Sequence, residues 1–291
     1  AQLASDMQKA IVGDDIDGVF AVDPVFLQYM LGIVGGTQLP DGTVVDGSNA
    51  AKVLLHDIYW NYPVEEQDAI FAAVAGSAFN KIVDELGSSD ITKIAGAIEK
   101  GASEGRILMY SRNDDEEKAA KALGISGALQ NDASEAPILG VFVNNYSYSK
   151  MDWFLDKRVT IDSSVENADG STTYRVTTTL KNTMTPQEKA EMPGYFQGHN
   201  GISQDIDDEV LRLYLYAPAG GSISGIKTSG SGSIEMNEAT HDGLKVAWGG
   251  VHMLLGQDIK VEYTVTTSTD SGHKALKVRT TPTAQTFEQD K

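Results

Sequence analysis

The residues most able to bind a metal or to act as a catalytic base are five histidines, and they are scattered along the chain. They are His56, His199, His241, His252 and His273. No two of them have the two- or four-residue spacing of metal ligands on one face of a strand or helix. Asp57 follows His56, but adjacent residues of a helix point in different directions. We therefore predict surface roles for this pair and no histidine metal site.

Other catalytic patterns are incomplete. Asp14–Gly18 comes nearest to a calcium-binding loop, but it lacks the alternating ligands and the terminal glutamate. The glycine-rich stretch Ser229–Ser233 is not followed by Lys-Ser or Lys-Thr, so it predicts a turn and not a phosphate loop. The chain has no Gly-x-Ser-x-Gly motif and no cysteine, which excludes disulfides and thiol chemistry. Paired carboxylates for glycoside hydrolysis stay open, because such pairs have no fixed sequence spacing.

An aromatic cluster lies close to the middle of the chain. Tyr146, Tyr148 and Trp153 stand there with polar residues between them. Aromatic side chains with polar tips often stack on sugars or peptides, and they equally often seal a contact between domains. We name these three residues as candidate binding residues, with the interdomain contact as the favoured alternative.

Helical patterns dominate the first half of the chain. Gly18–Val22 suits a buried strand, and Asp23 followed by Pro24 predicts the start of a helix. The clearest helix is expected over Val64–Leu86, where apolar residues recur every three or four positions. Further helices are expected at 24–33, 90–102 and 114–123, and further strands at 106–111 and 139–143. This alternation predicts an α/β domain over residues 1–145.

Strand patterns dominate the second half. Segments rich in Thr, Val, Ser and Tyr predict seven strands, at 159–165, 172–180, 210–216, 223–228, 244–248, 259–267 and 276–280. Asn167–Gly170 is typical of a hairpin turn, and the polar stretch Thr183–Asp208 is predicted to be a loop. Seven short strands joined by turns indicate an antiparallel, immunoglobulin-like β-sandwich over residues 150–283. The predicted fold class is therefore α+β, with an α/β domain followed by a sandwich.

The composition limits the possible partners. The chain has 41 acidic and 23 basic residues and a net charge of -18. Nucleic acids and anionic membrane surfaces are therefore poor partners, and no nucleic-acid partner is expected. No apolar run approaches the roughly 18 residues that a membrane-spanning helix needs. The first residues also lack the layout of a signal peptide, so we expect any export signal or membrane anchor to lie upstream or to have been removed.

Several segments, in the same order, resemble one known family. They are Asp17–Pro24, Leu27–Leu31, Leu39–Thr43, Val53–Tyr59, Gly140–Asn145, Ser149–Leu155 and Leu180–Thr183. The family is the uncharacterised, mostly actinobacterial one catalogued as domain of unknown function 4012. The resemblance implies an extracellular envelope protein of a Gram-positive actinobacterium, with an N-terminal membrane anchor and an upstream region that this chain would lack. Asp57, inside one of these segments, is a further candidate binding residue.

A smaller part of the chain is similar to the LytR-CpsA-Psr phosphotransferases, which attach glycopolymers to cell walls from polyprenyl-diphosphate carriers. Asp15–Asp23 and the Gly35-Gly36 turn carry this similarity. In that family an Arg-Gln pair on the following helix helps to hold the diphosphate. Here the corresponding place reads Glu66-Gln67, and a glutamate repels a diphosphate where a guanidinium would bind it. Gln67 is nevertheless named as a candidate binding residue.

These patterns together predict an extracellular envelope protein, at the cell surface or anchored to a membrane, that binds or scaffolds cell-wall glycopolymer. No cofactor and no metal are expected, and enzymatic activity stays open, with none favoured in this segment. One alternative is a LytR-CpsA-Psr-like transferase completed by upstream sequence, and another is a surface adhesin module. The first domain is expected to be the C-terminal part of a larger domain, so it should expose an apolar sheet edge or bind an upstream fragment of the same protein.

Overall fold

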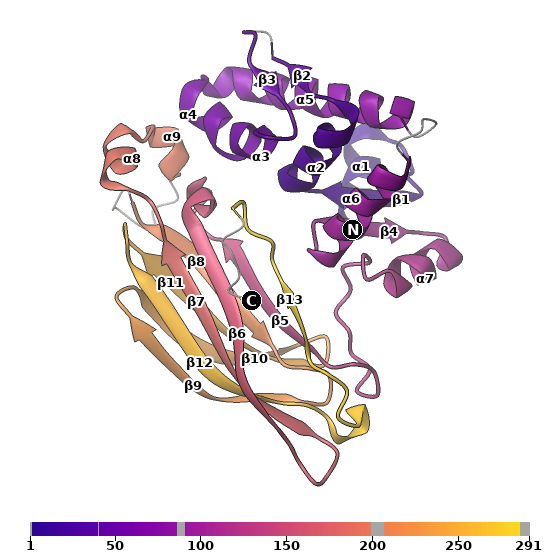
Figure 1. Cartoon of the computed structure of the whole chain (residues 1–291), viewed down its shortest axis with the longest axis vertical. Helices are drawn as coiled ribbons and strands as arrows, with labels where there is room; N and C mark the ends of the chain where they lie inside the picture. The colour runs from indigo at the N-terminus through magenta and orange to yellow at the C-terminus, as the bar shows by residue number, and fades with distance from the viewer. Residues whose placement is uncertain (1, 40, 86–90, 199–206, 286–291) are drawn as a thin grey trace. The chain divides into compact units, whose positions relative to one another are not determined.

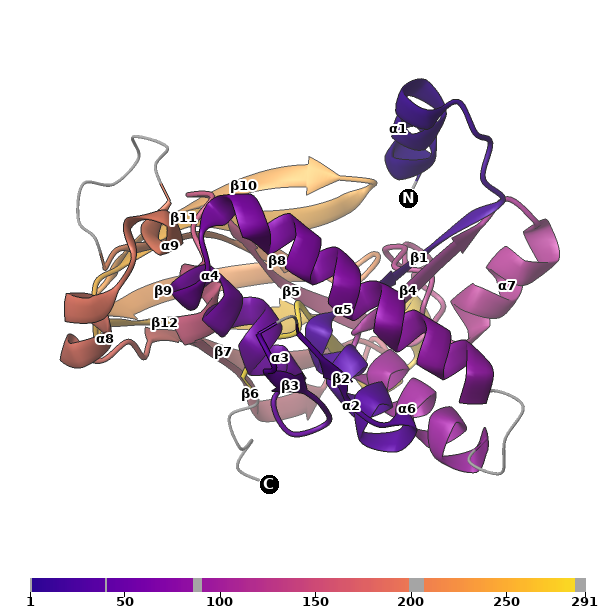
Figure 2. The same cartoon turned by 90° about the horizontal axis from the view of Figure 1, so that it is seen from above.

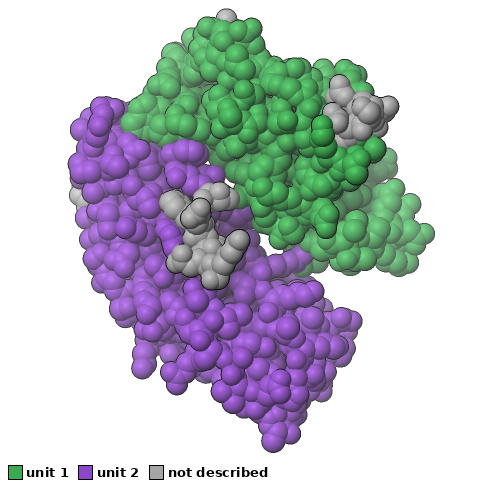
Figure 3. Space-filling model, viewed as in Figure 1, with its two compact units in different colours: residues 1–128 green, residues 129–291 purple. Residues whose placement is uncertain are grey.

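The computed structural model describes residues 2–39, 41–85, 91–198 and 207–285. The chain divides into two compact units, Ala1–Ala128 and Leu129–Lys291, which Figure 3 colours separately. Both helices and several sheets are present, so the predicted α+β class is confirmed. Each unit is described below by itself.

Unit 1 consists of helices and two small sheets (Figure 1). Its helices are α1 (Gln2–Val12), α2 (Pro24–Val34), α3 (Ala50–Lys52), the π-helix η1 (Val53–Asp57), α4 (Ile58–Asn61), α5 (Val64–Glu85), α6 (Ile91–Ser103) and α7 (Asp114–Ala122). Its strands are β1 (Gly18–Val22), β2 (Thr37–Gln38), β3 (Val44–Val45) and β4 (Ile107–Ser111). β1 pairs with β4 and β2 with β3, both antiparallel. Helices and strands alternate as expected, but the described strands of this unit form no parallel sheet.

Helix α2 begins where the sequence predicts it. Asp23 adopts an extended conformation and its Oδ1 accepts a hydrogen bond from the backbone N–H of Phe26 at 2.8 Å. Pro24 occupies the first turn, where its missing N–H costs nothing. The helix ends before Gly35, whose φ of 86° an L-residue rarely adopts. Local sequence alone therefore determines both ends of this helix.

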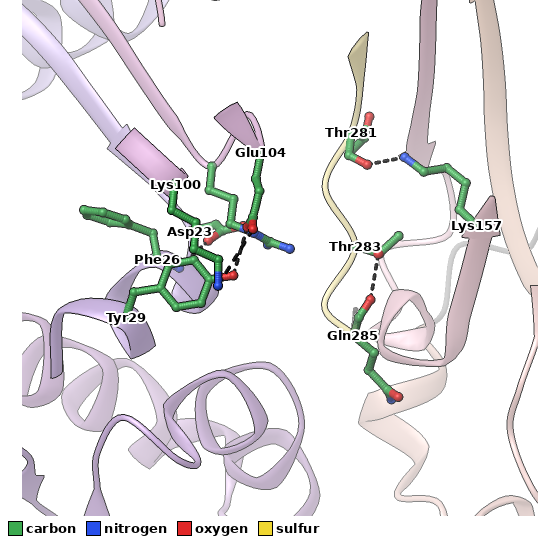
Figure 4. A network of polar contacts seen from close by, with 10 residues as sticks. Asp23, Phe26, Tyr29, Lys100, Glu104, Lys157, Thr281, Thr283 and Gln285 are labelled. Atoms are coloured by element: carbon green, nitrogen blue, oxygen red, sulfur yellow. Dashed lines mark hydrogen bonds and ion pairs between the residues drawn. The ribbon is translucent and has the colours of Figure 1, made fainter. Parts of the chain in front are cut away.

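A buried arginine links α2 to the end of α6 and the start of β4. The Arg106 side chain is 4% exposed and forms ion pairs of 2.6 Å with Asp23 and with Glu104. The Tyr29 hydroxyl donates to Glu104 at 2.9 Å, and the Lys100 ammonium lies 3.9 Å from the centroid of the Tyr29 ring. Figure 4 shows this network. Two carboxylates thus compensate one guanidinium that has been removed from water.

Strand β1 has apolar side chains that are exposed at the edge of a two-stranded sheet. In the two-stranded sheet it pairs with β4 alone. Phe20 is 60% exposed and Val22 is 47% exposed. The carbonyl of Asp17 and the N–H of Asp23 form hydrogen bonds with the backbone of Arg112 and Arg106, at the two ends of β4. Backbone groups of successive strand residues point to opposite sides, so the N–H and C=O groups of Phe20 and Val22 point away from β4.

Unit 2 consists mainly of two sheets. Its strands are β5 (Ile138–Asn145), β6 (Leu155–Glu166), β7 (Thr172–Asn182), β8 (Glu209–Tyr216), β9 (Ser222–Gly230), β10 (Ser233–His241), β11 (Leu244–Met253), β12 (Asp258–Thr266) and β13 (Lys277–Thr280). One sheet has the order β10-β11-β8-β5-β13 and the other β6-β7-β12-β9. All neighbours are antiparallel except β13 and β5. Apolar side chains of both sheets form one buried core, and Figure 2 shows the strands from a second direction.

Two sequence predictions about unit 2 need correction. The strand expected at 139–143 is β5, but it pairs with β8 and β13 of unit 2, although the sequence grouped it with the first domain. Its partners lie far along the chain, so local composition could not reveal them. The stretch 183–208 is not only a loop, because it contains α8 (Pro186–Glu191) and α9 (Gly194–Gln197). Thr185 and Glu188 cap α8 reciprocally, and their three-residue spacing is a local signal for a helix start. Residues 199–206 of that stretch, His199 among them, lie outside the described residues.

The short helices η2 (Met151–Phe154) and η3 (Thr269–Ser271) complete unit 2. Lys157 of β6 donates a hydrogen bond to the carbonyl of Thr281, which follows β13 (Figure 4). The Thr281 hydroxyl in turn accepts from the backbone N–H of Val143 in β5 at 3.1 Å. The C-terminal segment thus contacts both sheets. Among the described residues, no helix combines the length and the apolar character that crossing a membrane requires.

The Arg106 network gives a first prediction. Replacing Arg106 with Met keeps much of the side-chain volume but leaves Asp23 and Glu104 without their cation. We expect the free energy of unfolding of unit 1 to fall by about 2 to 4 kcal/mol, because breaking a buried ion pair leaves uncompensated charge. Urea unfolding followed by circular dichroism measures the change.

A matched control is Arg158→Met. Arg158 is 45% exposed and lies 3.4 Å from Asp156, so its removal should change the free energy of unfolding by about 0.5 kcal/mol or less. Equal effects of the two substitutions would show that the Arg106 network contributes no more than a surface pair does.

Candidate binding surface

Strand β8 turns two different kinds of side chain to its two faces. Three leucines are fully buried and belong to the core between the sheets: Leu211, Leu213 and Leu215. The residues between them are partly exposed on the opposite face: Arg212, Tyr214 and Tyr216. The same alternation in β5 and β11 buries Val141, Val143, Ala247 and Val251. It therefore places Phe142 and Trp248 beside the tyrosines of β8 on the outer face.

The strand register arranges these outer side chains in rows across the sheet. Phe142 of β5 pairs with Tyr214 of β8, and Tyr214 pairs with Trp248 of β11. The rings of Phe142 and Tyr216 also meet edge to face, with centroids 5.8 Å apart. We call the outer surface formed by these side chains the aromatic face: Phe142, Tyr146, Arg212, Tyr214, Tyr216 and Trp248.

Gly140 lets two of the rings approach each other. It pairs with Tyr216 across the β5–β8 ladder. A Cβ atom at this position would lie 2.6 Å from the ring of Phe142 and 3.1 Å from the Cβ of Tyr216. Both distances are shorter than ordinary van der Waals contact, so a larger residue would displace a ring. The glycine thus contributes to the geometry of the aromatic face without a side chain of its own.

The Arg212 guanidinium lies near two of the aromatic rings. Its guanidinium carbon lies 3.9 Å from the centroid of the Tyr146 ring and 5.4 Å from that of the Trp248 ring. Tyr146 is fixed in turn, because its backbone N–H donates to the carbonyl of Val210 at 3.0 Å. A cation over the face of an aromatic ring is attracted by the ring's negative π surface. These contacts orient the guanidinium through its π face and do not use its N–H donors.

The opposite end of the aromatic face is tied to the edge strand β10. The Tyr216 hydroxyl and Nδ1 of His241 lie 2.9 Å apart. Burial raises the pKa of Tyr216, and the negative charges of Tyr214, when ionised, and Asp242 raise it further. The phenol therefore stays neutral near physiological pH and offers a hydroxyl group at the surface.

The structure places the three aromatic candidates differently. Tyr146 contributes to the aromatic face through its contact with Arg212. Tyr148 is 85% exposed, so most of its ring is in contact with solvent. Trp153 lies in η2, where its carbonyl accepts from Nε2 of Gln285 at 3.0 Å. Sequence inspection missed Arg212 and Trp248, although the alternation of Arg, Tyr and Tyr with leucines in β8 was a usable signal.

The two remaining candidates belong to unit 1. Gln67 is 3% exposed, and its Nε2 donates to the carbonyl of Tyr62 at 3.0 Å, which holds the corner between α4 and α5. Asp57 accepts from the Lys52 ammonium at 2.6 Å. Its Oδ1 also lies 2.8 Å from Nδ1 of His56. The described contacts of Asp57 and Gln67 thus lie within unit 1. The hydrogen bond of Gln67 stabilises the packing of α4 against α5.

The prediction that His56 and Asp57 point apart is wrong. They lie in the π-helix η1, whose wider turn makes neighbouring residues diverge less than in an α-helix. The imidazole also stacks on the ring of Trp60, with centroids 4.7 Å apart and planes inclined by 19°. The carboxylate and the ring therefore orient each other. The imidazole is only 13% exposed, which limits the approach of a substrate to it.

A buried carboxyl lies on the inner side of β8. Glu209 is fully buried, and among the described residues neither of its carboxyl oxygens has a hydrogen-bond partner. Burial raises its pKa well above the usual range, and the negative charges of Asp152 and Asp208 raise it further. Burial also raises the pKa of Asp152, although the amide of Asn145 donates to this residue at 2.9 Å. Over the part of the chain that the structure describes, no group of three or more His, Cys, Asp or Glu residues could hold a metal ion.

The raised pKa of Glu209 predicts how stability depends on pH. The folded protein keeps a proton on Glu209 that the unfolded chain releases above its ordinary pKa of 4.5. The stability gained from that proton is complete below this value and is lost as pH rises toward the folded-state pKa. Glu209→Gln should therefore flatten the fall in unfolding free energy between pH 5 and 8, as measured by urea unfolding at each pH. Glu166→Gln, at an exposed position, is the control, and an equal flattening by both substitutions would contradict the assignment.

Comparison with known proteins supplies the family of the N-terminal segment. No curated protein matches the chain. The matched family model covers the region from α1 to the start of α4, within unit 1. Residues 1–59 match the family described as Protein of unknown function (DUF4012), which confirms over this segment the family expected from the sequence.

Proposed function

We propose that this protein is an extracellular cell-envelope component that binds glycopolymer on the aromatic face and serves as a binding or scaffolding module. One observation carries the proposal: aromatic side chains from neighbouring strands stand in register around Arg212. The envelope location rests on the family resemblance seen in the sequence. The proposed architecture is an immunoglobulin-like sandwich preceded by a LytR-CpsA-Psr-like domain.

The chemistry of the aromatic face suits a sugar chain. Sugar rings present C–H groups that pack on aromatic rings, while tyrosine hydroxyls and the indole N–H can bond their hydroxyl groups. The rings of Tyr214 and Trp248 lie on adjacent strands of one sheet, which are about 4.8 Å apart in a β-sheet. An open sheet surface with side chains at such short intervals can contact successive parts of a polymer. This arrangement supports binding along a chain more than enclosure of a small molecule.

The transferase alternative has less support from the described contacts. Gln67, its candidate diphosphate ligand, is buried and donates to a backbone carbonyl. A diphosphate needs accessible cationic donors, and the neighbouring Glu66 is negative. The proposal therefore rests on the aromatic face of unit 2.

Substitution of Tyr146 tests the proposal. Tyr146→Ala removes the ring that stacks on Arg212, and it lies in a loop outside the β-ladder. We expect the affinity for a retained glycan to fall about tenfold, corresponding to about 1.4 kcal/mol. A glycan array with the whole chain would identify the retained glycans, and isothermal titration calorimetry would measure the affinities.

The matched control is Tyr148→Ala. Tyr148 is the same residue type two positions away, but it is 85% exposed and outside the aromatic face. Its substitution should leave the affinity unchanged, and circular dichroism should show both variants folded. Retention of no glycan by the parent chain would refute glycan binding. Equal affinities of the two variants would refute the aromatic face as the site.

A further inference from the structure

We infer that the aromatic face recognises a glycan that carries carboxylate or phosphate groups, with Arg212 as the residue that binds the anion. This inference rests on the proposed function, because it assigns the ligand class of the same surface. Arginine keeps its positive charge at any physiological pH and presents five N–H donors along one plane. The groups that surround the guanidinium of Arg212 indicate which class of ligand it binds.

The described neighbours of Arg212 contact its guanidinium through aromatic rings but do not compensate its charge. Tyr146 and Trp248 contact the guanidinium through their π systems, which accept no conventional N–H···O bond. Among the described residues, none has a carboxylate within ion-pair distance of Arg212, whereas three other arginines have such partners: Arg106, Arg112 and Arg158. This occurs in a chain with 41 acidic and 23 basic residues. The charge of Arg212 is therefore available to an external anion.

The positions beside Arg212 leave room for such a group. Gly250 of β11 pairs with Arg212 and has no side chain, and a Cβ atom added there would meet nothing within 4 Å. On the other side Asn144 of β5 pairs with Arg212 and is exposed. Its amide can donate a further hydrogen bond to an oxygen of the ligand. The nearest acid in this row is Glu235, which pairs with Gly250 and so lies two strands away, roughly 10 Å.

The free energy of binding at Arg212 differs between an anionic ligand and a neutral one. A neutral sugar that covers Arg212 removes water from the guanidinium and returns only weak hydrogen bonds. A carboxylate or phosphate instead forms two charge-assisted N–H···O bonds in a fork geometry. The net charge of -18 opposes an anionic polymer at long range, but salt screens such repulsion beyond about 8 Å at physiological ionic strength. The local interaction therefore decides the preference.

The test compares a neutral oligomer with its anionic counterpart and with a second anionic oligomer that carries phosphate. The probes are galacturonic-acid oligomers, the same oligomers with methyl-esterified carboxyl groups, and glycerol-phosphate oligomers, each titrated into the whole chain at 0.15 M salt. We expect at least one of the anionic probes to bind about ten times more tightly than the esterified probe, and Arg212→Gln to abolish that difference. Arg212→Lys should recover only part of it, because an ammonium lacks the planar fork.

Arg175→Gln is the control, because Arg175 is exposed on β7 of the other sheet, and it should keep the preference. Thermal unfolding of each variant establishes that it is folded. Equal affinities for esterified and anionic probes would overturn the inference and leave the proposed glycan binding intact, as would a preference that persists in Arg212→Gln. If no neutral or anionic glycan binds, the proposed function fails and the inference fails with it.

Discussion

The two-residue period of the β-strands is the constraint on which the candidate surface depends. In β8 it buries Leu211 and Leu213 between the sheets, and it turns Arg212 and Tyr214 outward. A shift of one residue would exchange the two sets, placing an arginine in the core and leucines in water. The burial of the core therefore determines the register, and the register aligns the aromatic rings of neighbouring strands. The same free energy that stabilises unit 2 thus positions its candidate binding surface.

The chain stabilises two of its arginines in different ways. Arg106 is 4% exposed and is paired with two carboxylates, so its charge is compensated within unit 1. Arg212 is partly exposed and contacts aromatic rings, which orient it without compensating its charge. The first arrangement suits a structural link between elements. The second suits recognition of an anion, because no described carboxylate compensates the charge.

The first inward-facing residue of β8 carries a carboxyl group that no described residue of the core hydrogen-bonds. Glu209 follows the same inward direction as the leucines but lies beside Asp152 and Asp208, which repel its ionised form. Asn182, fully buried, lies at the end of β7, and its amide donates to the carbonyls of Asp207 and Met253. Hydrogen bonds of this kind fix the chain at the end of the core. Glu209 is instead accommodated by keeping its proton.

Local sequence determined the elements whose signals are complete within a few residues. The Asp23-Pro24 cap, the apolar period of α5 and the alternation in β8 each predicted a correct helix or strand, because the residues involved interact with their own neighbours in sequence. Strand β10 was missed, since its apolar alternation is limited to Ile234 and Met236 and polar residues fill most of this edge strand. The contact of His56 with Asp57 was missed because nothing in the sequence announced a π-helix.

Tertiary structure alone decided where β5 belongs and which residues meet Arg212. The strand pairs of β5 and the rings of Tyr146 and Trp248 come from segments far apart in the chain. Sequence inspection could name Tyr146 as a candidate because aromatic residues cluster near it. It could not join Tyr146 to Arg212 and Trp248, because that contact depends on sheet order and register, which are set by burial of the whole core.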